Sequence, residues 1–242
     1  GRDDAMPAPA PAWQRLHRTL SARDPWLVAV AFLLYSGQWL AVIGFLPTIV
    51  GQAGYPGAVV GLLSAVAALV NMVGNVGAGR WLAGGVRPGW VLAVAYITMG
   101  LAAVVAFGAQ GYPVPQYAAV LVFSAVGGLI PGTLFVLAVR LAPGPDTVST
   151  TVGWMQQLSS LGQFAGPPLV AWVATEVGGW HLTWAGTSFA SAVGLAVAWG
   201  VYTLAGPLWG AGDTLPRVGP LPVVLPLPLA LLPLAGPAQA LL

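Results

Sequence analysis

Six apolar segments, each about as long as a membrane-crossing helix, divide this sequence and constrain its fold more than any other feature. They cover residues 26–50, 57–78, 89–107, 116–138, 147–174 and 183–205, and no Asp, Glu, Lys or Arg falls in their central stretches. A helix of about 20 residues crosses the hydrocarbon layer of a bilayer, where every backbone polar group must be paired internally. The pattern predicts an all-α integral membrane protein with six transmembrane helices.

The composition excludes several other classes of protein. Only 6% of the residues are charged and 57% are hydrophobic, whereas about a quarter of a soluble chain is charged. The few basic residues do not form the clustered patch that nucleic-acid binding requires, and the absence of cysteine excludes a disulfide framework. The two histidines, His17 and His181, lie outside the apolar segments, so we expect no enzyme, no cofactor and no metal site.

Near the apolar segments, arginine occurs only on alternate connections. Three arginines precede the first segment, two lie between the second and third, one follows the fourth and one follows the sixth: Arg15, Arg18, Arg23, Arg80, Arg87, Arg140 and Arg217. The connections 51–56, 108–115 and 175–182 contain none. Because arginine in short loops stays on the cytoplasmic side, we predict a multi-pass protein of the plasma (inner) membrane with both termini cytoplasmic.

The two ends differ from the six-helix bundle at 26–205. Residues 1–25 are expected to form a cytoplasmic segment, in which 13–20 is either an amphipathic helix on the membrane surface or a solvated linker. Residues 206–242 form an apolar tail rich in proline. Since each interior proline costs a helix about 3 kcal/mol, we predict that this tail is disordered or interfacial.

Polar side chains gather on particular segments and form our candidate substrate-binding set. Its members are Tyr35, Gln38 and Trp39 on the first segment, Asn71 and Asn75 on the second, and Gln156, Gln157, Ser160 and Gln163 on the fifth. Amides that face lipid lack partners, so these side chains should point inward. There they either line a solute path or hold helices together; the cluster at 156–163 is denser than adhesion requires, which favours lining.

Glycine and proline mark two candidate helix breaks. Gly128 and Pro131 interrupt the fourth segment, and Pro167 and Pro168 interrupt the fifth. Each is either a static kink or a bend that takes part in gating, because neighbouring helices and water can satisfy the carbonyls that such residues release.

Three stretches carry a resemblance to a known family. Residues 37–50 read GQWLAVIGFLPTIV, residues 75–88 read NVGAGRWLAGGVRP, and residues 162–173 read GQFAGPPLVAWV. With the six-segment pattern, they resemble the C-terminal half of a major facilitator superfamily transporter, in particular the cyanate and nitroimidazole permease-like branch. The resemblance implies two inverted three-helix repeats, half of a twelve-helix fold. It also implies a secondary transporter that moves a small solute by alternating access, together with a missing N-terminal half or a second copy of the chain.

The turn after the second segment matches the family in part. The superfamily carries a pattern like G-x-L-x-D-R-x-G-R-R there, and Gly79, Arg80, Gly84 and Arg87 keep some of it. Ala83 stands where an acidic residue is expected, so the charged latch is incomplete. The two arginines therefore either belong to a gating loop or anchor the turn to lipid headgroups. The alternative to a transporter is a truncated remnant that transports nothing, or a helical partner subunit of a membrane complex.

Overall fold

The computed structural model describes residues 10–52, 54–109 and 111–205, and its elements there are helical. In chain order they are α1 (Ala12–Ser21), α2 (Arg23–Gln52), α3 (Gly57–Leu69), α4 (Asn71–Ala83), α5 (Pro88–Gly108), α6 (Pro113–Gly127), α7 (Leu129–Arg140), α8 (Val148–Glu176) and α9 (Thr183–Ala205). Short 3-10 turns at Pro145–Thr147 and Trp180–Leu182 precede α8 and α9. The predicted tail at 206–242 and the first nine residues of the predicted N-terminal segment lie outside the described residues.

Five helical stretches in this part of the chain are long and apolar enough to cross a membrane. They are Arg23–Thr48, Gly57–Ala83, Pro88–Gly108, Pro113–Arg140 and Thr183–Thr203, and they match the first, second, third, fourth and sixth predicted spans. An all-α membrane protein is consistent with this arrangement. The fifth predicted span is α8, whose 29 residues extend for about 43 Å. Its polar side chains lower its mean hydropathy below that of the other five stretches. A sixth span therefore stays a prediction.

Local sequence explains where several helices begin and end. Pro88 and Pro113 each start a helix at a position where the missing N–H is not needed. Gly85 and Gly111, with φ of 84° and 86°, make the turns that precede those helices. This left-handed conformation is readily available only to glycine. The loops are therefore short, and consecutive spans run antiparallel.

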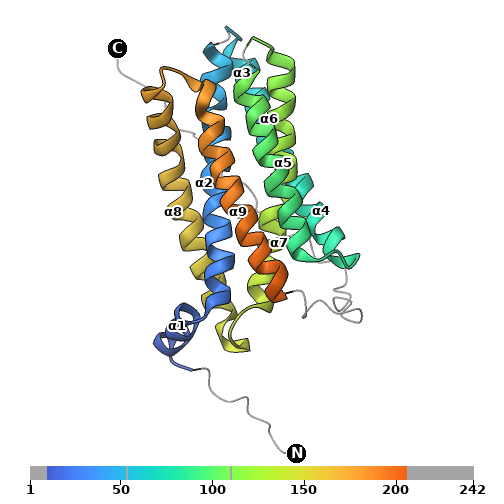
Figure 1. Ribbon diagram of the computed structural model, residues 1–242, viewed down its shortest axis with the longest axis vertical. Helices are drawn as coiled ribbons and strands as arrows, with labels where there is room; N and C mark the ends of the chain where they lie inside the picture. The colour runs from blue at the N-terminus through green and yellow to red at the C-terminus, as the bar shows by residue number, and fades with distance from the viewer. Residues whose placement is uncertain (1–9, 53, 110, 206–242) are drawn as a thin grey trace, which may run out of the picture.

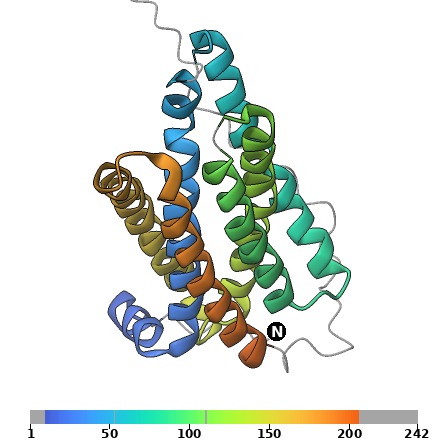
Figure 2. The same cartoon turned by 45° about the horizontal axis from the view of Figure 1, so that its top comes forward.

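Helix α2 lies along the middle of the bundle (Figure 1). Its most extensive packing is against α8, while α5 packs against both α9 and α6, and α4 packs against α7. In both views α8 lies at one side of α2 and α4 lies at the opposite side of the bundle (Figure 2). Among the described helices, none covers the outer face of α8 or the outer face of α3 and α4.

Small residues allow two pairs of helices to cross closely. At the α2–α8 crossing, a Cβ placed on Gly37 would lie 2.9 Å from the carbonyl oxygen of Gly162, and Gly166 also lies against Gly37. At the α4–α7 crossing, a Cβ on Gly132 would lie 2.7 Å from Ala78 Cβ. Close backbone approach through glycine and alanine is typical of helix pairs in membranes. Both crossings therefore depend on missing side chains.

Two of the long helical stretches are interrupted next to each other. The second span breaks at Val70, between α3 and α4, and the fourth breaks at Gly128, between α6 and α7. The Gly128 backbone packs against the carbonyl of Asn71, and a Cβ there would lie 3.1 Å from the Asn75 nitrogen. The two breaks thus lie at one level of the bundle.

The described arginines that flank the spans gather at one end of the bundle. This end holds α1, the end of α4, the start of α5 and the end of α7 (Figure 1). Arg18 of α1 forms an ion pair with Asp146, which ties α1 to the turn before α8. Residues 13–20 are therefore helical and held against the bundle, and they do not form a solvated linker.

Candidate functional site

A hydrogen-bonded network joins α2, α4 and α6. The Asn71 side-chain nitrogen donates to the Tyr35 hydroxyl at 2.9 Å and to the Ser124 carbonyl at 2.8 Å. Trp39 donates its ring N–H to the Ser124 hydroxyl at 3.1 Å, and Asn75 donates to the backbone and side-chain oxygens of Asn71 at 3.2 Å. Four members of the predicted substrate-binding set therefore lie together.

The helices place these side chains for simple reasons. Tyr35 and Trp39 are four residues apart and so share one face of α2. Asn71 is the first residue of α4, directly after the break at Val70, and Ser124 lies in the last turn of α6. Tyr35 is buried, while Asn71 and Asn75 are half-buried. A tyrosine hydroxyl that accepts one hydrogen bond can still donate another, and an amide oxygen can accept two, so the network has donors and acceptors that its internal hydrogen bonds do not use.

Gln38 belongs to a different part of the molecule. Its side-chain oxygen accepts a hydrogen bond from the Ser191 hydroxyl of α9 at 2.9 Å, so it points away from α4 and α6. It is only 4% exposed, and its side-chain nitrogen has no partner among the described residues. The structure thus separates Gln38 from Tyr35 and Trp39, its neighbours on α2.

The polar cluster on α8 is separate again. Gln156, Gln157, Ser160 and Gln163 are exposed on this helix. Ser160 donates to the Gln156 carbonyl at 3.0 Å, and Gln163 donates to the Ser159 hydroxyl at 3.2 Å. Within the described residues, these four side chains form no hydrogen bond with the network around Asn71. The bundle alone therefore does not assemble the predicted set into one site.

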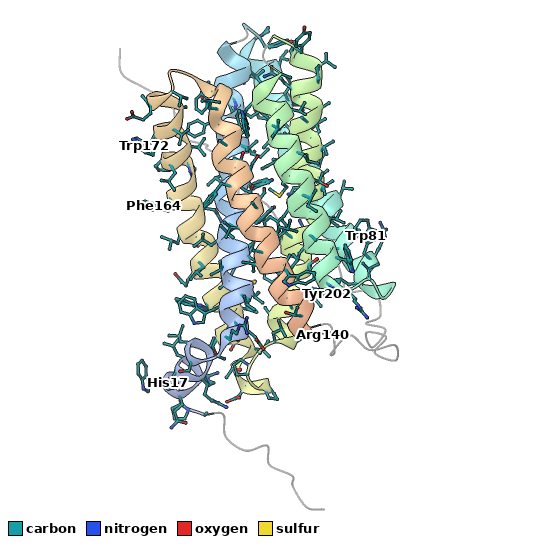
Figure 3. All side chains as sticks on the ribbon, viewed as in Figure 1. His17, Trp81, Arg140, Phe164, Trp172 and Tyr202 are labelled. Atoms are coloured by element: carbon teal, nitrogen blue, oxygen red, sulfur yellow. The ribbon has the colours of Figure 1, made fainter. Side chains whose placement is uncertain are left out.

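The candidate gating turn and helix breaks have distinct settings. The turn residues Gly79, Arg80 and Gly84 are exposed, and the exposed Arg87 donates to the Tyr202 hydroxyl of α9 at 3.1 Å, with its guanidinium 5.7 Å from the Tyr202 ring centre. Arg87 thereby links the turn to the end of α9, where Figure 3 labels Tyr202.

The proline positions also differ from one another. The fourth span is divided at Gly128 into α6 and α7, and the buried Pro131 lies in the first turn of α7. Helix α8, by contrast, continues through Pro167 and Pro168 as a single element. Any bend at these prolines therefore lies within one helix.

Several contributing residues were not part of the predicted set. Ser124 accepts a hydrogen bond from Trp39, and Ser191 donates one to Gln38. Ser36 donates to the Ser159 carbonyl at 2.9 Å across the α2–α8 crossing. Small hydroxyls in a helix commonly bond their own backbone, so the sequence offers little signal that these reach another helix. Among the described residues, no group of three or more His, Cys, Asp or Glu side chains could hold a metal ion.

Comparison with known proteins found no matching family model and no matching curated protein. The resemblance to a transporter family consequently rests on the sequence alone.

Proposed function

We propose that this chain is a six-helix half of a secondary transporter of the major facilitator type, which moves a small solute by alternating access. In this proposal it resides in the plasma (inner) membrane with both termini cytoplasmic. A missing N-terminal half, or a second copy of the chain, completes the solute path.

The pairing of the helices supports two inverted repeats. The first repeat would contain α2, α3 with α4, and α5, and the second would contain α6 with α7, α8, and α9. The second helix of each set packs on the first helix of the other: α4 on α7, and α8 on α2. Both contacts use glycine, and the third helices, α5 and α9, pack on each other. This exchange is what a pseudo-two-fold axis in the membrane plane predicts.

The observation that carries the proposal is the uncovered polar face of α8. Gln156 and Gln157 are exposed on a helix that lies along α2. Amide groups cannot face hydrocarbon without losing their hydrogen bonds. This face therefore needs water or another polypeptide, and an aqueous path between two halves supplies both.

The chemistry of the network suits an uncharged polar solute. Tyr35, Trp39, Asn71 and Asn75 offer donors and acceptors but no fixed charge. Intramembrane charges are the usual proton relays and counter-ions, and the central stretches of the predicted spans contain none. Any coupling ion, or any counter-charge for a charged solute, would be handled by the other half.

A helical partner subunit is the second candidate, and the apolar part of the α8 surface favours it. Phe164 is 80% exposed, and both Phe164 and Trp172 lie on the side of α8 away from the bundle (Figure 3). Large exposed apolar side chains are expected in lipid, but apolar and aromatic side chains also form the centre of permanent protein interfaces. In that case another protein would cover the α8 face at all times.

A labelling experiment separates the two candidates. The chain has no cysteine, so Gln156→Cys, with Phe164→Cys as the control on the same helix, creates a single thiol. In native membranes, a water-filled path predicts that a charged thiosulfonate reagent modifies Gln156→Cys at least tenfold faster than Phe164→Cys. Saturable uptake of a small neutral solute should accompany this in cells where the chain is paired with its other half or with a second copy. Equal, slow modification of both thiols would refute the transporter and favour the subunit.

A further inference from the structure

A pocket separate from the polar network lies between α2, α8 and α9. Its volume is about 310 Å³, and its lining is almost entirely apolar. Gly37, Gly162 and Gly166 form part of its wall where α2 and α8 cross. Leu169 and Phe189 also line it and are exposed, Phe189 by 71%, so the pocket opens toward the outer surface between α8 and α9.

Two residues that line this pocket, Gln38 and Thr183, each carry a buried polar atom that has no hydrogen-bond partner among the described residues. The Gln38 side-chain nitrogen has none, although the other end of the same amide is paired with Ser191. The hydroxyl of Thr183, which is 1% exposed, also has none. Because the amide oxygen accepts the hydrogen bond from Ser191, the end of Gln38 that is left unpaired is the nitrogen, which is a donor.

An unpaired amide in an apolar cavity points to a missing partner. Buried polar groups are nearly always hydrogen-bonded, and leaving one unpaired costs free energy. A water molecule needs two to four polar partners to be stable, and this wall offers few. An apolar molecule with one acceptor oxygen would pack against the apolar lining and accept a hydrogen bond from the amide.

We propose that this pocket binds a neutral, mostly apolar molecule that presents a carbonyl-type oxygen to the side-chain nitrogen of Gln38. At about 30 Å³ for a water-sized group, the volume accommodates roughly ten non-hydrogen atoms. The molecule enters from the bilayer past Leu169 and Phe189. It is either a small solute dissolved in the membrane or the ester region of a lipid, and the site is independent of the transport proposal.

Protection of an introduced thiol tests this site. Ala190 lines the pocket, whereas the exposed Ala192 does not, so Ala190→Cys and Ala192→Cys form a matched pair in the full chain purified in detergent. The rate of modification by methyl methanethiosulfonate is measured with 2-octanone, and with nonane, which has the same number of non-hydrogen atoms but no acceptor. We expect 2-octanone to slow modification at Ala190→Cys only, with an affinity about fivefold higher than that of nonane.

Two further variants test the hydrogen bond to Gln38 and the free volume of the pocket. Gln38→Leu should reduce the affinity for 2-octanone to that for nonane. Gly186 also lines the pocket, and a Cβ there meets nothing within 4 Å, so Gly186→Leu should fill the space, fold normally and abolish protection by either probe. Far-UV circular dichroism checks the fold of each variant.

A lipid arm identifies the source of the ligand. If added dioleoylphosphatidylcholine protects Ala190→Cys in a Gln38-dependent manner, the occupant is a lipid ester. If only 2-octanone does so, the occupant is a small solute. Equal protection by 2-octanone and nonane, unchanged protection in well-folded Gly186→Leu, or no protection by any probe would overturn the proposal.

Discussion

The close crossing of α2 and α8 makes a quantitative prediction about Gly37. A Cβ at this position would lie 2.9 Å from the Gly162 carbonyl oxygen, about 0.5 Å inside the 3.4 Å at which ordinary van der Waals contact begins. Gly37→Ala must therefore push the two helices apart. A gap of this size forfeits a quarter or more of each nearby contact energy, and it weakens the hydrogen bond from Ser36 to the Ser159 carbonyl.

The same helix supplies a control. Gly44 also lies within α2, but a Cβ there meets nothing within 4 Å. Alanine favours a helix over glycine by about 1 kcal/mol at either site, so this gain cancels when the two variants are compared. Overpacking typically costs about 1–3 kcal/mol, and Gly37→Ala should be less stable than Gly44→Ala by that amount.

Unfolding in mixed micelles measures this difference. The fraction of sodium dodecyl sulfate is raised while helicity is followed by far-UV circular dichroism, and the free energy of unfolding is extrapolated for each variant. Gly166→Ala and Gly153→Ala repeat the comparison from α8, since Gly166 lies against Gly37 and Gly153 is open. If Gly37→Ala were as stable as Gly44→Ala, the described crossing would be wrong.

Two other predictions concern the network and the topology. Asn71→Leu removes two interhelical hydrogen bonds; at about 0.6 kcal/mol for each such bond in a membrane, it should lower the free energy of unfolding by about 1.2 kcal/mol in the same titration, and no loss would mean that the network is not formed. Gly84→Cys lies in the turn after α4, and Thr175→Cys lies in the last turn of α8, at the other end of the bundle. The first should react with an impermeant maleimide from the cytoplasmic side and the second from the outer side. Reaction of both from one side would contradict the orientation.

The positions of the helices were largely predictable from the sequence. Length and hydropathy are local properties, and the described helices begin and end within a few residues of the predicted spans. The interruption at Gly128 has a local signal in glycine and proline. The break at Val70 has none, because neither residue type occurs from 62 to 73. It coincides with the contacts of Asn71 to α2 and α6, which only the folded bundle provides.

The candidate site was predictable only in part, for geometric reasons. Helical periodicity placed Tyr35 and Trp39 on one face of α2, and both meet the network around Asn71 and Ser124. Gln38 is about 60° around the helix from Tyr35 at 100° per residue, which is enough for it to meet α9 instead. Which neighbour lies at each angle depends on the packing of distant segments, and periodicity carries no information about that.

The adjacent interruptions at Val70 and Gly128 lie where the second and fourth spans meet backbone to backbone. Since the Gly128 backbone rests on the Asn71 carbonyl, α4 cannot tilt relative to α3 without displacing the start of α7. Gly132 packs against Ala78 further along the same two helices. A side chain added at Gly128 would therefore displace α4 and α7 together.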